Sequence, residues 1–277
     1  MPSHHTIVLV HGAWGGAWVW RRLLAPLRAA GREVHAVTLT GDGERAHLRH
    51  AGIDLFMHIN DVMGLIDAEE LGDITLVGHS YGGQVITGVA DRLLQRQAEA
   101  ASASASTTAT ATATASASTA AANGANITAR AAARQPVLRQ LVYIDAMVPV
   151  PGEGWGDLHP PQVVAARRAA AAAHDNALPP VDPLHFGIDG ADRDWLLRRH
   201  VPHPFGAYQQ ALPFDGERWA AVPRCFVDCV QPAYATIAEA RLRVRSQSGW
   251  RVVEMATGHF PMITMPHALT ALLLELS

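Results

Sequence analysis

The 277-residue sequence has only two cysteines and no long apolar run. Cys225 and Cys229 lie four positions apart in one predicted strand, where a rise of about 3.3 Å per residue keeps them too far apart for a disulfide. Scarce cysteine is typical of a reducing compartment, and we expect a cytoplasmic location. No apolar run approaches the roughly 18 residues of a membrane span, and Thr6–Val10 is too short for a signal-peptide core, so we expect no membrane partner.

Basic residues are scarce as well, and they do not cluster along the chain. The sequence has 22 Lys and Arg against 25 Asp and Glu, which gives a formal net charge of -3 at pH 7. A protein that binds a phosphate backbone needs a basic face. We therefore expect no nucleic-acid partner.

Residues 97–134 differ in composition from the rest of the chain, because residues 100–122 contain only Ala, Ser and Thr. Alternating Thr and Ser lower the helix propensity of the alanines, and no large apolar side chain is present to dock on a core. We expect a poorly ordered surface insert that takes no part in chemistry. Setting these 38 residues aside leaves 239 of the 277, enough for a single domain with one hydrophobic core.

Short runs of β-branched residues alternate with longer helical patterns, which is typical of a parallel sheet with crossover helices. The expected strands are Thr6–Val10, Glu33–Leu39, Ile74–Val77, Leu141–Asp145, Arg224–Val227 and Arg251–Met255. The expected helices are Trp18–Ala30, His58–Leu71, Gln84–Gln97 and His267–Leu276. The sequence thus predicts an α/β fold with a six-stranded, mostly parallel sheet flanked by helices.

Residues 150–221, called the cap segment below, interrupt this alternation. They are rich in Pro, His and Trp, and they lie between two strands that one helix should otherwise connect. A connection of this length is usually a functional insertion. We expect a helical cap over an active site.

The strongest local motif is Gly78-His79-Ser80-Tyr81-Gly82, between a predicted strand and a predicted helix. The pattern Gly-x-Ser-x-Gly places a serine on a sharp strand-to-helix turn, whose strained backbone needs small neighbours. A serine hydroxyl at such a turn becomes a nucleophile when a base takes its proton. The motif therefore predicts Ser80 as a nucleophile, with an inert serine in a tight turn as the alternative.

Of the 15 histidines, His259 is best placed to be that base. It follows the last predicted strand, so a parallel sheet would bring it to the same carboxyl edge as Ser80. The oxyanion that forms during attack needs N–H donors, which we expect from the backbone of Tyr81 and of Ala13. Ala13 lies in the loop His11–Gly16, whose glycines do not match the Gly-x-Gly-x-x-Gly of dinucleotide sites.

Together these motifs resemble the alpha/beta-hydrolase superfamily. Residues 11–48 are similar to its subgroup of salicylate-binding methyl esterases, hydroxynitrile lyases and bacterial esterase relatives. The resemblance implies a cofactor-free serine hydrolase that cleaves a small to medium carboxylic ester, a small-molecule substrate, through an acyl enzyme.

Three positions favour the esterase branch of this subgroup. Hydroxynitrile lyases carry Thr where this chain has Gly12 and Lys where it has Phe260, and the related dehalogenases and epoxide hydrolases carry Asp in place of Ser80. A lyase acting on cyanohydrins and a ligand-binding receptor with little turnover remain as alternatives.

The acid of a catalytic triad is open between two aspartates. In most relatives the acid follows the strand at 224–227, but here the following loop contains no carboxylate. Asp145 ends a predicted strand at the catalytic edge, a position from which some alpha/beta hydrolases take their acid. Asp228 lies inside or at the end of its strand. We favour Asp145 over Asp228, and either fits the chain order of nucleophile, acid and base.

Four tryptophans are candidates to line an apolar substrate pocket or to hold the cap segment on the core: Trp14, Trp155, Trp195 and Trp219. Of these we expect Trp14 and Trp155 to contact substrate. His200 and His203 have a loose metal-ligand spacing, but no neighbouring Cys or carboxylate completes a set. We therefore expect no metal site.

Overall fold

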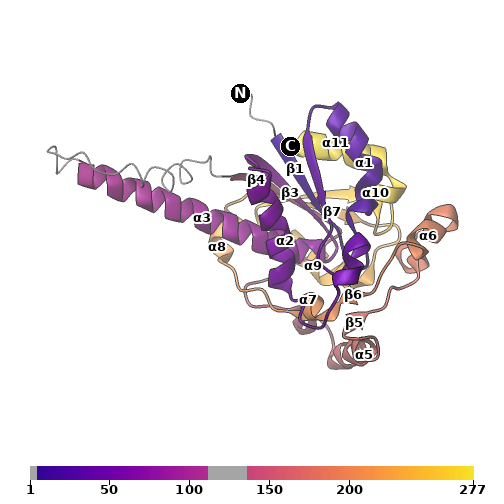
Figure 1. The fold of residues 1–277 in the computed structure, drawn as a ribbon. Coiled ribbons are helices and arrows are strands. Elements are labelled where there is room, and N and C mark those ends of the chain that lie inside the picture. The colour runs from indigo at the N-terminus through magenta and orange to yellow at the C-terminus, as the bar shows by residue number, and fades with distance from the viewer. Residues whose placement is uncertain (1–4, 112–135) are drawn as a thin grey trace.

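The computed structural model describes residues 5–111 and 136–277. Its centre is a six-stranded sheet in which every pairing is parallel, with the strand order β2-β1-β3-β4-β7-β8 (Figure 1). The strands are β1 (His5–Val10), β2 (Glu33–Val37), β3 (Asp73–His79), β4 (Val137–Ile144), β7 (Arg224–Cys229) and β8 (Trp250–Met255). The predicted α/β fold with a six-stranded sheet is confirmed.

The middle of the sheet is buried on both faces. All seven residues of β3 are buried, as are all six of β7, and β1 is buried from Thr6 to Val10. A parallel sheet covered on both sides needs continuous apolar runs rather than alternation, and Ile7–Val10 is such a run. This burial fixes the carboxyl ends of β1, β3 and β4 as a rigid base for the loops that follow them.

Helices flank the sheet on both faces. The core helices are α1 (Arg21–Ala29), α2 (Leu55–Ala68), α3 (Gly82–Ala111), α9 (Ala238–Ser246), α10 (Pro261–Thr264) and α11 (Pro266–Leu276). Because β2 and β3 lie on opposite sides of β1, right-handed crossovers put α1 on one face and α2 with α3 on the other. The loops after β1 and β3 diverge at this reversal, which is where open parallel sheets bind their ligands.

Helix α3 is longer than predicted. It continues past Gln97 to Ala111 and projects away from the sheet (Figure 1). The sequence did not predict a helix over residues 98–111, which alanine favours because extending an existing helix costs much less than starting one. The expectation of poor order in the insert stays a prediction. Residues 112–134 of the insert lie outside the described residues.

The cap segment contains more than helices. Its elements are the 3-10 turns η3 (Trp155–Leu158) and η4 (Pro183–Phe186), the helices α5 (Pro161–Ala172), α6 (Gly190–Leu197), α7 (Phe205–Gln209) and α8 (Gly216–Ala220), and the strands β5 (Ala177–Leu178) and β6 (His203–Pro204). The two strands form an antiparallel pair that the sequence did not predict. Figure 1 shows α5, β5, β6 and α7 at the end of the sheet opposite the amino terminus, beside the loops that follow the strands.

The remaining sequence expectations concern individual helices, turns and cysteines. Three further 3-10 turns, η1 (Ala17–Trp20), η2 (Gly43–Leu48) and η5 (Ala235–Ile237), and helix α9 were not predicted. Cys225 and Cys229 are free and buried in β7, as expected. Over residues 5–111 and 136–277, no helix combines the length and the apolar character that a bilayer crossing requires.

Candidate active site

Ser80 stands on a sharp turn between β3 and α3. Its backbone has a φ of 52°, and its carbonyl accepts hydrogen bonds from the N–H of Gly83 and of Met147. The flanking glycines are required by close approach, since a Cβ on Gly78 would lie 2.5 Å from the carbonyl oxygen of Gly82. A Cβ on Gly82 would in turn lie 2.7 Å from the carbonyl oxygen of Val10. The predicted strand-turn-helix geometry of the motif is therefore present.

His259 lies in the loop between β8 and α10 and is almost fully buried. Its Nδ1–H donates to Asp145 Oδ2 at 2.6 Å, and its backbone N–H donates to the carbonyl of Phe186 at 3.1 Å. Its own carbonyl accepts from His79 Nε2–H at 2.8 Å. Because Asp145 accepts the hydrogen bond from Nδ1–H, the proton stays on Nδ1 and Nε2 is left as an acceptor, which is what a general base needs.

The Ser80 hydroxyl and the His259 ring lie at the same edge of the sheet. His79, the residue before the serine, has its ring 4.6 Å from the ring of His259. No hydrogen bond joins Ser80 Oγ to His259 Nε2 in the part of the chain that the structure describes. Such bonds are often long in an empty hydrolase and shorten when substrate binds.

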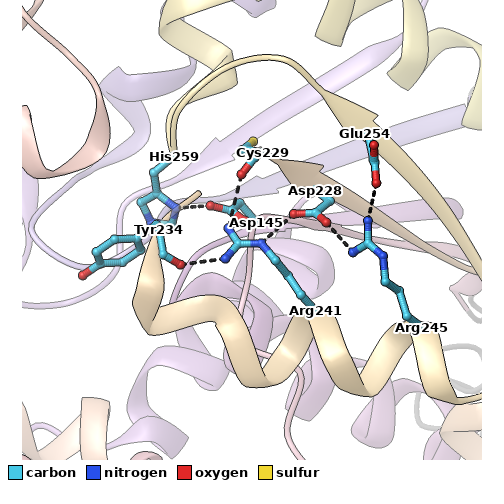
Figure 2. A network of polar contacts seen from close by, with 8 residues as sticks. All are labelled: Asp145, Asp228, Cys229, Tyr234, Arg241, Arg245, Glu254 and His259. Atoms are coloured by element: carbon cyan, nitrogen blue, oxygen red, sulfur yellow. Dashed lines mark hydrogen bonds and ion pairs between the residues drawn. The ribbon is translucent and has the colours of Figure 1, made fainter. Parts of the chain in front are cut away.

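Asp145, and not Asp228, is the carboxylate that contacts His259 (Figure 2). Asp145 directly follows β4, with a φ of 40° that Asp tolerates better than most residues. Asp228 lies within β7, and its oxygens accept from Arg241 and Arg245 instead. The geometry therefore selects the first of the two aspartates between which the sequence left the choice open.

The two backbone N–H groups predicted as oxyanion donors lie on either side of Ser80. Tyr81 precedes the first residue of α3, so its N–H lies at the positive end of a helix dipole. Ala13 lies in the loop after β1, which touches the nucleophile: a Cβ on Gly12 would be 2.7 Å from Ser80 Cβ. Among the described residues, neither the Tyr81 nor the Ala13 N–H donates to any acceptor, so both are available to a ligand.

A buried polar network that sequence reasoning missed lies behind Tyr81. The Tyr81 hydroxyl donates to His58 Nδ1 at 2.9 Å, and His58 Nε2–H donates to the carbonyl of Thr40 at 2.8 Å. Burial raises the pKa of Tyr81 and lowers the pKa of His58, so both groups are neutral at pH 7. The network holds the residue that carries one candidate oxyanion donor.

His203 of the cap segment contacts a carboxylate that is not near it in the sequence. Its Nδ1 lies 2.9 Å from Asp42 Oδ2, and both side chains are fully buried. Burial raises the pKa of Asp42 to about 7 and lowers the pKa of His203 to about 3. A protonated Asp42 carboxyl and a neutral His203 imidazole are therefore the favoured forms at mildly acidic pH. The two residues are 161 positions apart, so no local pattern could have joined them.

His200 and His203 do not share a metal site. His200 packs against the rings of Trp18 and Phe260, and neither of its ring nitrogens has a hydrogen-bond partner among the residues that the structure describes. Within residues 5–111 and 136–277, no cluster of three or more His, Cys, Asp or Glu side chains is arranged to hold a metal ion.

Trp14 joins the oxyanion loop to the cap segment. Its indole Nε1–H donates to the carbonyl of Leu178 at 3.1 Å, and its own carbonyl accepts from the N–H of Val201. Its ring centroid is 6.1 Å from that of Phe186, which in turn lies 5.4 Å from the His259 ring. Trp14 thus lies in an aromatic cluster around the candidate base.

Within the described part of the chain, the rings that contact His259 include no cap tryptophan. Trp155 is fully buried and stacks on His159, and only through Tyr208 do its ring contacts reach Tyr81. Trp195 packs edge-on against Trp18 near the surface. Trp219 donates from Nε1 to the hydroxyl of Tyr143 behind the sheet. Trp195 and Trp219 therefore attach the cap segment to the core.

Comparison with known proteins identifies the family of this chain. Residues 7–272 match the alpha/beta hydrolase family. The chain belongs to that family. The resemblance that the sequence motifs indicate is confirmed.

This alpha/beta hydrolase has relatives among bacterial and plant esterases. It is 35% identical over 277 residues to the carbendazim hydrolyzing esterase of Nocardioides sp. (strain SG-4G), covering 95% of each chain. It is 36% identical over 80 residues to methylesterase 10 of Arabidopsis thaliana, covering 28% of this chain and 29% of that protein. Its fold is similar to that of an extracellular alpha/beta-hydrolase from a Paenibacillus species, with a TM-score of 0.68, 17% identity and 98% of each chain covered.

Proposed function

We propose that this alpha/beta hydrolase is a serine carboxylesterase that cleaves a small to medium ester through an acyl enzyme. The observation that carries the proposal is the 2.6 Å hydrogen bond from His259 Nδ1–H to Asp145 Oδ2, which leaves Nε2 free to accept a proton at the sheet edge that carries Ser80. The 35% identity to a bacterial esterase over 95% of both chains supports the same reaction class.

In the proposed first step, Ser80 Oγ attacks the ester carbonyl carbon while His259 Nε2 takes the hydroxyl proton. Asp145 stays ionised and stabilises the imidazolium, and the carbonyl oxygen receives hydrogen bonds from the N–H groups of Ala13 and Tyr81. When the tetrahedral intermediate collapses, the C–O bond to the alcohol breaks and His259 returns the proton to the leaving oxygen. A water molecule then attacks the acyl enzyme with His259 as base, which releases the acid and restores Ser80.

His79 does not compete with His259 for the role of base. Burial and the neighbouring His259 ring lower the pKa of His79 well below its ordinary value, so it stays neutral. Its Nε2–H is occupied by the His259 carbonyl. We propose that His79 supports the loop that carries the base.

We propose that Trp14 forms one wall of the acyl pocket, since it directly follows Ala13 and packs on Phe186 beside His259. Trp155 reaches Tyr81 only through Tyr208, so in this proposal it shapes the pocket from behind. The close contact between Gly12 and Ser80 favours ester cleavage over cyanohydrin cleavage, because a threonine at position 12 could be accepted only if the loop moved.

A fluorophosphonate probe, which phosphonylates activated serines, tests the nucleophile. Wild type is expected to be labelled, to lose activity in proportion, and to turn over 4-nitrophenyl acetate many times per molecule, and carbendazim is a further substrate to test. Ser80→Ala should abolish labelling and turnover, whereas Ser246→Ala, at an exposed serine of α9, should leave both unchanged. Turnover below one equivalent would favour the receptor alternative, and cyanide release from mandelonitrile would favour the lyase.

A further inference from the structure

Arg241 of α9 is fixed by hydrogen bonds on all three of its guanidinium nitrogens. Nη2 donates to Asp145 Oδ1 at 2.5 Å and to the carbonyl of Cys229 at 3.3 Å, Nε donates to Asp228 Oδ1 at 2.6 Å, and Nη1 donates to the carbonyl of Tyr234 at 2.7 Å. The side chain is only 12% exposed. A guanidinium held by this many acceptors has one orientation available to it.

Two buried carboxylates meet at this guanidinium (Figure 2). The side chains of Asp145 and Asp228 are 0% and 2% exposed; Asp145 directly follows β4, and Asp228 lies inside the neighbouring strand β7. Without a cation between them, two buried like charges would repel each other strongly. Arg241 separates them and, together with Arg245, takes both oxygens of Asp228. Among the described residues, both oxygens of Asp228 accept from arginines and neither accepts from His259.

The guanidinium also decides how Asp145 faces the imidazole. Arginine only donates, so Asp145 Oδ1 must accept from it, and the remaining oxygen Oδ2 accepts from His259 Nδ1–H. With one oxygen accepting from Arg241 and the other from His259, the imidazole is held in the tautomer whose Nε2 is free. The ionic cluster of Arg241, Arg245, Asp145, Asp228 and Glu254 has one excess negative charge, which a proton on His259 neutralises.

We propose that Arg241 is a positioning residue for the reaction of Ser80: it turns Asp145 toward His259, keeps Asp228 away from it and thereby sets the histidine tautomer. The inference rests on the proposed esterase function. Nothing in the local sequence around Arg241 indicates this role, since its partners lie up to 96 positions away.

The first test separates kcat from KM. Arg241→Met should lower kcat by about 10- to 100-fold at nearly constant KM, because it disturbs the acid that orients the base and not the ester site. The matched control is Arg243→Met, which removes an equally buried arginine of α9 that pairs with Glu153 and the carbonyl of Val148 and contacts neither Asp145 nor Asp228, and it should leave kcat within threefold. Equal losses in the two variants would overturn the proposal.

The second test is a double-mutant cycle with Asp145→Asn. With Arg241 present, the amide oxygen at position 145 must face the guanidinium, so the NH₂ group faces His259 Nδ1 and forces the wrong tautomer, at a cost of about 10⁴-fold in kcat. With Arg241→Met added, the amide can turn its oxygen to Nδ1–H. The double variant should therefore be more active than Asp145→Asn alone, and a double variant less active than either single one would refute the inference.

The closing measurement does not depend on turnover. Nitrogen-15 NMR of histidine-labelled protein should show the Nδ1–H tautomer of His259 in wild type, the Nε2–H tautomer in Asp145→Asn, and Nδ1–H again in the double variant. If Arg241→Met does not fold, the double variant Arg241→Met/Asp228→Asn replaces it in each comparison. This variant removes the negative charge of Asp228 together with the positive charge of Arg241. An unchanged tautomer across the series refutes the role of Arg241, whereas a correct tautomer series in a protein that lacks turnover refutes the esterase proposal alone.

Discussion

Replacing Gly258 by alanine should disable the base without touching any of its side-chain contacts. A Cβ on Gly258 would lie 2.0 Å from the carbonyl oxygen of Phe186, the acceptor of the His259 N–H. The φ of Gly258 lies outside the left-handed region, so alanine is compatible with the backbone and the effect is purely steric. A relaxed C···O contact is about 3.3 Å, so the loop carrying His259 and the η4 turn must separate by roughly 1.3 Å.

A shift of this size has a definite kinetic cost. A misplacement of about 1 Å at a reacting group lowers the rate about 100-fold, which corresponds to about 2.7 kcal/mol in the activation free energy. We therefore expect Gly258→Ala to lower kcat for 4-nitrophenyl acetate about 100-fold or more while the protein remains folded by circular dichroism.

The matched control is Gly64→Ala in the interior of α2, where an added Cβ meets no atom within 4 Å. It should leave kcat unchanged and raise the free energy of unfolding by about 0.4–1 kcal/mol. A value of kcat for Gly258→Ala within threefold of wild type would refute the reasoning that the cap segment positions the base.

Two further predictions concern stability and the insert. Burial lowers the pKa of His200 to about 4. Between pH 6.5 and 4, His200 therefore binds a proton in the unfolded chain but not in the folded chain. As the pH falls through this range, the free energy of unfolding of wild type decreases by about 3 kcal/mol because of this residue. His200→Phe should lack that loss when unfolding free energies at pH 7.5 and 4 are compared, and a parallel decline in both proteins would contradict it. Replacing residues 98–135 with a short Gly-Ser linker should leave kcat within threefold, because the side-chain amide of Gln97 donates to the carbonyl of Pro136 at 2.7 Å and the two ends to be joined are therefore close. Loss of activity in a folded, soluble deletion protein would show that the insert supports the site.

Local patterns were sufficient to predict the sheet and the turn that carries Ser80. The β-branched runs and the two glycines around the serine act over a few residues, so their physics can be read along the chain. The exact ends of the strands could not be predicted from such local patterns. Asp228 is inside β7 and Asp145 is one residue beyond β4, and this small difference in register decides which carboxylate faces His259.

The missed side-chain contacts depend on distant partners. Arg241 comes from a helix that the sequence did not predict, and it meets Asp145 across 96 positions. The pair of Asp42 and His203 spans 161 positions. Such contacts exist only once the sheet and the cap segment have packed together, so no periodicity or motif indicates them.

The cap segment is bonded to the loops that carry Trp14 and His259. It can therefore be exchanged only for a segment that makes the same bonds. The segment supplies the carbonyl of Leu178 to Trp14 and the carbonyl of Phe186 to the backbone of His259. A transplanted segment from another hydrolase would have to provide both acceptors at the same places, whatever its pocket looks like. We therefore expect that exchanging the cap segment to alter substrate range also shifts the position of His259.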